Sequence, residues 1–238
     1  MYINLLMGNI CIIPARGGSK RIPRKNIREF HGKPMIAWSI EVARESGLFE
    51  RIVVTTDDKE IAEIAESHGA EIPFLRAAEL ADDFTGTIPV VADAIKRIRA
   101  FGYEHSEICC LYPTAPFVTC EDLKNGLQLL REQDWSFVFS ATDYSYPVFR
   151  SFHNNANGGL QMVFPEHFHT RSQELRDVYH DAGQFYWGTA EAWLEDIALF
   201  GSKSTIVKLP RWRVQDIDSE QDWAAAEQIY PRFASLKS

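Results

Sequence analysis

The sequence predicts an α/β protein: a three-layer α/β/α domain around a mostly parallel, twisted sheet. Over residues 10–142, short apolar runs alternate with amphipathic segments of helical periodicity. The apolar runs are continuous, as expected of strands that helices cover on both faces. The length of 238 residues and a hydrophobic fraction of 45% suit a single domain with a sizeable core.

The elements expected in this first part follow one another in a regular order. The expected strands are 10–14 (ICIIP), 51–56 (RIVVTT), 70–75 (AEIPFL), 107–112 (EICCLY) and 136–142 (SFVFSAT). The expected helices are 34–46, 58–69, 87–101 and 120–133. Pro34 suits the first turn of its helix, and Gly47 suits the end of the same helix. Parallel strands joined in this way are expected to have right-handed crossovers.

The pattern changes in residues 144–182, which are rich in aromatic residues, His, Asn and Gly. A turn at 154–159 (NNANGG) separates two candidate strands, 149–153 and 160–164. We therefore expect a hairpin insertion within one domain that spans residues 1–238. The regular pattern then resumes with a strand at 184–188, a helix at 189–196, a strand at 205–209 and a closing helix near 220–234.

Composition argues against several classes of protein. A net charge of -8 speaks against general nucleic-acid binding, which needs a broad basic face. No apolar run approaches the roughly 20 residues that span a membrane. The first 13 residues lack the basic region of a signal peptide, and Met7 is an alternative start. The four cysteines form no CxxC pair, so we expect neither disulfides nor a zinc site, and a reducing cytoplasm.

A basic segment directly follows the first expected strand. Six of the thirteen residues 16–28 (RGGSKRIPRKNIR) are Lys or Arg, and none is acidic. Ligands bind at the carboxyl ends of strands in open α/β sheets, so this segment lies where a ligand is expected. Gly17 lets the backbone approach a ligand closely, and Arg16, Lys20 and Lys25 would neutralise phosphates. The segment is neither a P-loop nor a GxGxxG fingerprint, and a solvated basic turn is the alternative.

Two aspartates near the end of the chain form a candidate metal site. Asp216 and Asp218 are two residues apart, so on an extended segment their side chains point the same way. Magnesium prefers one or two carboxylates together with waters and phosphate oxygens. Alternatively these residues lead into a helix that Ser219 caps, and the two interpretations are compatible because both aspartates precede the cap.

The spacing in the basic segment resembles the nucleotide-binding signature of the CMP-sialic acid synthetase (acylneuraminate cytidylyltransferase) family. The matching residues are Ala15, Arg16, Ser19, Lys20, Pro23, Lys25 and Asn26. Residues 74–84 and 112–116 resemble further family segments, although Tyr112 stands where many members have Gln. The resemblance implies a Rossmann-like nucleotidyltransferase fold, a bound CTP and a Mg²⁺ ion. It assigns CTP binding to Ala15, Arg16, Gly17, Ser19, Lys25, Asn26 and Arg76. It assigns catalysis to Arg16, Lys25, Asp216 and Asp218, and the metal to the last two.

The resemblance also implies the reaction. The anomeric hydroxyl of a nine-carbon acidic sugar would attack the α-phosphate of CTP, and pyrophosphate would leave. By the same resemblance, Arg171, Gln184 and Tyr186 would bind the sugar. A general base is not identifiable, since the side chains of adjacent His180 and Asp181 point apart on an extended segment.

Residues 109–117, 179–188 and 213–218 most resemble the branch of the family that acts on pseudaminic acid. N-acetylneuraminic or legionaminic acid stays open as the acceptor, as does a catalytically silent nucleotide- or sugar-binding protein. The resemblance further implies a homodimer, in which the insertion at 144–182 of one subunit reaches the sugar pocket of the other.

Overall fold

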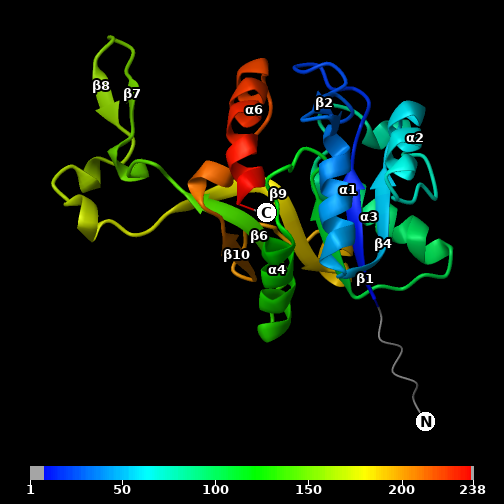
Figure 1. Cartoon of the computed structure of the whole chain (residues 1–238). Coiled ribbons are helices and arrows are strands. Elements are labelled where there is room, and N and C mark those ends of the chain that lie inside the picture. Colours follow the sequence, from blue (N-terminus) through cyan, green and yellow to red (C-terminus); the bar gives the residue numbers. More distant parts are fainter. Residues whose placement is uncertain (1–7, 237–238) are drawn as a thin grey trace.

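The computed structural model describes residues 8–236, so the alternative start at Met7 lies outside the described part. Its centre is one six-stranded sheet with the strand order β10-β6-β9-β5-β1-β4 (Figure 1). The strands are β1 (Asn9–Pro14), β4 (Phe49–Thr55), β5 (Glu107–Leu111), β6 (Phe137–Asp143), β9 (Tyr179–Thr189) and β10 (Ser204–Lys208). β1 pairs in parallel with β4 and β5, and β6 pairs in parallel with β10. β9 runs antiparallel between β5 and β6, so the predicted mostly parallel sheet is confirmed with one reversed strand.

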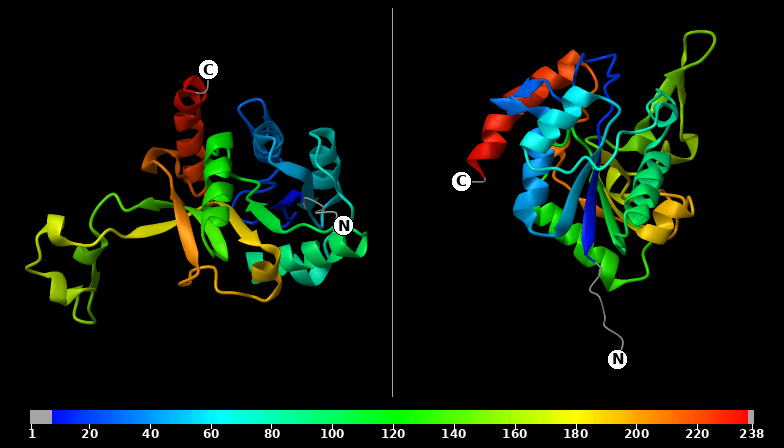
Figure 2. Two further views of the ribbon diagram at one scale, coloured as in Figure 1. Left: turned by 90° about the horizontal axis from the view of Figure 1, so that it is seen from below. Right: turned by 90° about the vertical axis from the view of Figure 1, so that its right-hand side faces the viewer.

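Helices cover both faces of this sheet (Figure 2). The helices are α1 (Met35–Ser46), α2 (Lys59–Ser67), α3 (Thr87–Ala100), α4 (Cys120–Glu132), α5 (Ala190–Leu194) and α6 (Glu220–Ser235). α1, α2 and α4 share one core cluster with Cys11 and Ile13 of β1. α3 and α5 share another cluster with Ile10 and Ile12, the alternate residues of the same strand. β1 is therefore buried on both faces, and each such large apolar side chain stabilises the fold by about 1.5–3 kcal/mol.

α6 packs apart from the sheet, in a third core cluster. Trp223, Tyr230 and Phe233 of α6 pack there against Ile22 and Phe30 from the segment that follows β1. Its start is fixed by a capping box between Ser219 and Asp222. This cluster joins the C-terminal helix to the basic segment near the N-terminus. A short antiparallel pair, β2 (Glu29–Phe30) and β3 (Lys33–Pro34), connects that segment to α1.

Two expected strands differ from those observed. Residues 70–75 form no strand, because their pairing with β4 is limited to a single bridge between Val53 and Glu71 before Pro73 interrupts it. The strand expected at 184–188 is the second half of the longer β9. Its first half is polar and pairs with β6 beyond an irregularity near Gly183, which has a φ of 62°.

The predicted hairpin insertion is present and projects away from the domain in Figure 1. It consists of β7 (Phe152–Asn154) and β8 (Leu160–Met162), which are shorter than expected, and the short 3₁₀ turns η2 (Val148–Arg150), η3 (Pro165–His167) and η4 (Ser172–Glu174). Two more such turns, η1 (Ala78–Leu80) and η5 (Arg211–Arg213), lie elsewhere in the domain. Across residues 8–236 no helix has both the length and the apolar character to cross a membrane.

Candidate active site

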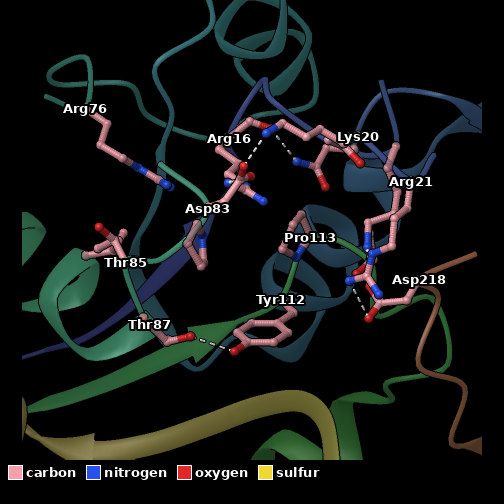
Figure 3. A pocket seen from close by; sticks show the side chains of 17 residues that line it. Arg16, Lys20, Arg21, Arg76, Asp83, Thr85, Thr87, Tyr112, Pro113 and Asp218 are labelled. Atoms are coloured by element: carbon pink, nitrogen blue, oxygen red, sulfur yellow. Dashed lines mark hydrogen bonds and ion pairs between the residues drawn. The ribbon is translucent and has the colours of Figure 1, made fainter. Parts of the chain in front are cut away.

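A cleft of about 620 Å³ opens beyond the carboxyl ends of β1 and β5 (Figure 3). Its lining comes from the basic loop, which we define as residues 15–28, from the region between residue 76 and the first turns of α3, from the end of β5 and from Asp218. The charged residues in this lining are Arg16, Lys20, Arg21, Lys25, Arg76, Asp83 and Asp218. Five cations therefore face two carboxylates, although the whole chain has a net charge of -8. Such local positive charge suits a polyanionic ligand.

Hydrogen bonds within the basic loop fix its shape. The buried amide of Asn26 donates from Nδ2 to the carbonyl oxygen of Arg16 over 3.0 Å, which ties the two ends of the loop together. The backbone amides of Lys25 and Arg28 donate to the carbonyl oxygens of Ile22 and Arg24. These bonds fix the backbone of the loop, so its basic side chains extend from defined positions.

A second set of contacts anchors the loop to the start of α2. Arg24 has a φ of 57° and forms ion pairs with Asp58 and Glu60. Asp58 also caps α2 by accepting from the backbone amide of Ile61 over 3.0 Å, and its hydrogen bond from Arg24 lowers the pKa of its carboxyl. A Cβ at Gly17 would lie 2.6 Å from Oδ2 of Asp58, so only glycine fits against this anchor.

Lys25 connects the basic loop to the aspartate segment from the end of the chain. Its Nζ donates to the carbonyl oxygen of Ile217 over 2.6 Å and to Oδ1 of Asp218 over 3.1 Å. Arg21 forms an ion pair with Oδ2 of Asp218 over 2.8 Å. Because Ile217 is buried in the third core cluster, the backbone of this segment is held in place beside the loop.

Asp216 and Asp218 flank Ile217, and burial and the charge of Asp218 both contribute to a raised pKa of Asp216. Desolvation raises the pKa of the Asp216 carboxyl, the charge of Asp218 raises it further, and Lys25 partly offsets both. Two carboxylates that repel each other are a donor set that suits a hard divalent cation. Within residues 8–236, no cluster of three or more His, Cys, Asp or Glu side chains could hold a metal ion alone. A cation bound here would therefore need ligands from water or from a phosphate.

Arg76 reaches the cleft from the side opposite Asp218 (Figure 3). Its guanidinium is buried and donates to the carbonyl oxygen and to Oγ1 of Thr55. Burial lowers its pKa to about 10, so it still carries a positive charge at neutral pH.

The predicted CTP-binding residues do not all line the cleft. Arg16, Ser19, Lys25, Asn26 and Arg76 do. The side chain of Ala15 is instead fully buried in the first core cluster. The backbone amide of Gly17 donates to Oδ1 of Asp57 over 2.9 Å, so that donor is already used within the protein.

Asp83 is a cleft residue that the sequence reasoning missed. Its carboxylate forms ion pairs with Arg16, over 2.8 Å, and with Lys20. These bonds, from Lys20 first and Arg16 second, lower the pKa of the Asp83 carboxyl. A carboxylate of the same chain thus neutralises two cations of the cleft. The only sequence signal was a pair of acids, Asp82 and Asp83, close after Arg76.

The contact between Tyr112 and Thr87 is a second feature of the cleft that the sequence reasoning missed. Their hydroxyl oxygens lie 2.6 Å apart at the floor of the cleft, where the end of β5 meets the first turn of α3 (Figure 3). Burial raises the pKa of Tyr112 to about 12. The sequence placed Tyr112 correctly at a strand end, but nothing in it indicated the contact with a residue of α3.

The three predicted sugar-binding residues lie outside this cleft. Arg171 is exposed on the insertion, at the start of η4. Gln184 is buried and donates from Nε2 to the carbonyl oxygen of Arg213 over 2.8 Å. Tyr186 is buried, and its hydroxyl donates to Oδ2 of Asp181 over 2.6 Å while its ring packs against that of Tyr112.

A second cavity, of about 600 Å³, lies at the base of the insertion. Its polar lining includes Arg176, Asp177, Tyr179, His180 and Asp181, and aromatic side chains provide much of the rest. Asp181 lines this cavity and is bonded to Tyr186, whose ring packs against that of the cleft residue Tyr112.

Comparisons with known proteins agree with this geometry. Residues 10–186 match the family model described as cytidylyltransferase. The chain is 45% identical to the pseudaminic acid cytidylyltransferase of Campylobacter jejuni serotype O:2, over 94% of this chain and 97% of that protein. It is 32% identical to the CMP-N,N'-diacetyllegionaminic acid synthase of Legionella pneumophila, over 92% and 95% of the two chains.

Among solved structures, CMP:2-keto-3-deoxy-manno-octonic acid synthetase in complex with CTP has a similar fold. The TM-score is 0.68, and the match covers 94% of this chain and 99% of that one at 16% identity. A 4-diphosphocytidyl-2C-methyl-D-erythritol synthase from Anaerococcus prevotii also matches, with a TM-score of 0.62 and 12% identity over 97% and 96% of the two chains. The predicted nucleotidyltransferase-like fold is confirmed.

The ion pairs of Asp83 lead to a first prediction. If its carboxylate occupies cations of the anion site, Asp83→Asn frees Arg16 and Lys20 and should bind inorganic triphosphate severalfold more tightly than the wild type. Isothermal titration calorimetry measures this affinity. Asp82→Asn is the matched control, because it removes the same charge from a side chain that bonds within its own turn, to Phe84 and Thr85, and not to Arg16 or Lys20. Equal effects of both variants, or weaker binding by Asp83→Asn, would contradict the prediction.

Proposed function

The chain belongs to the cytidylyltransferase family, and from this premise we propose that it transfers CMP from CTP to pseudaminic acid and releases pyrophosphate. The observation that carries the proposal is the cleft, in which five cations meet the carboxylates of Asp83 and Asp218 at the carboxyl edge of the sheet, with Asp216 outside its lining. The 45% identity over nearly the full length of both chains supports pseudaminic acid as the acceptor, and the 32% identity to a legionaminic acid enzyme makes that sugar the alternative.

In this proposal the basic loop binds the triphosphate of CTP. Arg16 and Lys20 bind phosphate oxygens after Asp83 has been displaced, and Lys25 does so from its position beside Asp218. Ser19 and Asn26 line the same part of the cleft, and Arg76 contributes a buried cation on the nucleoside side. Catalysis is then mainly positioning and the stabilisation of charge that develops on the α-phosphate and on the leaving pyrophosphate.

We further propose that Asp216 and Asp218 hold a divalent cation, Mg²⁺, next to the triphosphate. A bound Mg²⁺ would neutralise phosphate charge and act as a Lewis acid. The raised pKa of Asp216 supports this assignment, since a cation would relieve the repulsion between the two carboxylates. Lys25 and Arg21 hold Asp218 at the edge of the cleft, and Ile217 fixes the backbone between the two aspartates.

We propose that the acceptor sugar binds in the second cavity, whose residue Asp181 is connected through Tyr186 to the cleft residue Tyr112. This cavity offers Arg176 for the sugar carboxylate and several side chains that can bind hydroxyl and amide groups. Tyr186 borders it through its bond to Asp181. Arg171 is not part of this lining and is assigned to the neighbouring subunit's cavity instead.

A pyrophosphate-release assay tests the proposed reaction. The wild-type protein is mixed with CTP, Mg²⁺ and one of pseudaminic, N,N'-diacetyllegionaminic or N-acetylneuraminic acid. We expect the highest kcat/KM with pseudaminic acid, because the lining of one cavity cannot fit three acidic sugars of different stereochemistry equally well. Release only with another nonulosonic acid would change the acceptor, and no release with any of them would refute the enzyme function.

A homodimer is proposed because the insertion exposes large apolar side chains that the rest of its own chain does not cover. The most exposed of these are Tyr146, Phe152, Leu160, Val163 and Phe168. A projecting hairpin with such a surface is typical of a protein–protein contact. In a dimer these side chains would be buried, and Arg171 on the same insertion would lie against the partner.

Light scattering on Leu160→Asp tests the dimer. The wild type should have twice the chain mass of 27.2 kDa at micromolar concentration, and Leu160→Asp should be monomeric with reduced turnover, because a buried carboxylate disfavours the contact. Phe101→Asp, which changes an exposed aromatic residue at the end of α3, should stay dimeric and active. A monomeric wild type with full turnover would refute the dimer.

A further inference from the structure

The basic residues of the basic loop fall into two groups. Four of them line the cleft, namely Arg16, Lys20, Arg21 and Lys25. The other two, Arg24 and Arg28, pair instead with the acidic starts of two neighbouring helices. Arg24 contacts Asp58 and Glu60 at the start of α2, and Arg28 contacts Glu220 at the start of α6 (Figure 1). A basic residue in this segment is therefore not necessarily a phosphate ligand.

Arg24 has a backbone conformation that is unusual for its residue type. Its φ is 57°, in the left-handed region that residues with a Cβ rarely adopt. Its carbonyl oxygen accepts from the backbone amides of Ile27 and Arg28, over 3.0 and 2.9 Å, so the chain turns sharply here. As a result, the side chain of Arg24 reaches α2, whereas that of its neighbour Lys25 reaches Asp218 at the cleft. The left-handed turn thus sends two adjacent cations in different directions.

Asp58 holds Arg24 with both of its carboxylate oxygens. Oδ1 accepts from Nη2 of Arg24 over 3.1 Å and from the backbone amide of Ile61 over 3.0 Å, and Oδ2 accepts from Nη1 of Arg24. A two-point pair of this kind fixes the orientation of the planar guanidinium. Oδ2 also lies so close to Gly17 that a Cβ there would be 2.6 Å from it. Asp58 is therefore adjacent to the loop at two positions, Gly17 and Arg24.

We propose that Arg24 and Asp58 are a positioning pair for the phosphate site, whose contact turns the loop so that Lys25 faces the cleft. This inference rests on the proposed function, because that function assigns the phosphates of the nucleotide to the cleft side of the loop. Arg24 acts through the backbone that it shares with Lys25, and Asp58 acts through Arg24. Neither side chain binds phosphate itself.

Simple electrostatics predicts the opposite sign for a change at Asp58. Its hydrogen bond from Arg24 lowers the pKa of the Asp58 carboxyl, so Asp58 is ionised at neutral pH. Like charges repel over about 8 Å at physiological ionic strength, so removal of this carboxylate should by charge alone tighten the binding of a polyanion. The same sign is expected if Arg24 is a phosphate ligand, because Arg24 would be freed. The positioning pair predicts weaker binding instead.

Asp58→Asn is the sharpest variant, because it keeps the cap of α2. The backbone amide of Ile61 needs an acceptor, so Oδ1 of the new side chain stays on it and Nδ2 faces Nη1 of Arg24. Two donors then oppose each other and the pair is lost, although asparagine caps a helix as well as aspartate does. We expect the Kd of inorganic triphosphate, measured by isothermal titration calorimetry, to rise about tenfold, as for a lost charge-assisted hydrogen bond. The melting temperature should change little.

Glu60→Gln is the matched control, because it removes the same charge from the other partner of Arg24. The side chain of Glu60 is 65% exposed, and exposed ion pairs contribute little to the conformation of their partners. The Kd of triphosphate should therefore stay within about twofold of the wild-type value.

Two variants of Arg24 separate the role of its backbone from that of its side chain. Arg24→Gly and Arg24→Ala both remove the guanidinium, but glycine adopts a φ of 57° without strain and alanine does not. If Arg24 acts by directing Lys25, Arg24→Gly should bind triphosphate severalfold more tightly than Arg24→Ala. A direct phosphate ligand would make the two variants equal.

A double variant tests whether Asp58 acts through Lys25. Lys25→Met removes the cation that the pair is proposed to direct, so in that background Asp58→Asn has nothing left to misplace. We expect Lys25→Met/Asp58→Asn to bind triphosphate no more weakly than Lys25→Met alone.

The possible failures are distinguishable. Tighter binding by Asp58→Asn, equal affinities of Arg24→Gly and Arg24→Ala, or full additivity of Asp58→Asn with Lys25→Met would overturn the positioning pair. An unchanged Kd together with a lower melting temperature would also overturn it, because the contact would then serve stability alone. Wild-type protein that binds triphosphate but releases no pyrophosphate with any nonulosonic acid would refute the proposed function, while the order of the calorimetric affinities still decides the positioning pair.

Discussion

The contact of Lys25 with residues 217 and 218 is the interaction on which the whole cleft depends. It joins segments 192 residues apart, the basic loop after the first strand and the acidic segment before the last helix. Neither segment is a site alone, because clustered cations repel one another and a pair of aspartates repels itself. Lys25 and Arg21 form ion pairs with Asp218, and the third core cluster around Ile217 holds the backbone next to Asp218 in position.

The same balance of charge explains why the cleft is filled with internal ion pairs. Asp83 pairs with Arg16 and Lys20, and Asp218 pairs with Arg21 and Lys25, so each carboxylate neutralises two cations of the cleft. In the proposed function, phosphate oxygens replace Asp83 with little rearrangement of the cations, since the loop backbone is fixed by its own hydrogen bonds. The protein therefore holds its cations ready for a ligand at a modest cost, because these pairs are partly exposed.

The sequence was sufficient for those features that depend on local pattern. Continuous apolar runs predicted five of the central strands and the second half of β9. The resemblance to a family signature pointed to Arg16, Lys25 and Asn26, which all line the cleft. Sequence patterns did not predict the features that a single residue or a contact with a distant segment determines. Pro73 interrupts a strand that the neighbouring residues favour. Thr87 and Tyr112 meet only because β5 and α3 converge, and Asp83 meets Arg16 and Lys20 from a distant segment of the chain. The hydrogen bond between Tyr186 and Asp181 depends on an irregular register in β9 that periodicity does not reveal.

Calorimetric titration of CTP with and without Mg²⁺, on the wild type and on Asp218→Asn, tests the central claim that Lys25 and Asp218 join the phosphate and metal sites. The account predicts that Mg²⁺ tightens CTP binding to the wild type and has little effect on Asp218→Asn, which still binds metal-free CTP because Lys25 and Arg21 are freed. Glu220→Gln, which changes a neighbouring carboxylate paired with Arg28, should behave as the wild type. An Asp218→Asn protein that keeps the full effect of Mg²⁺ would contradict the account.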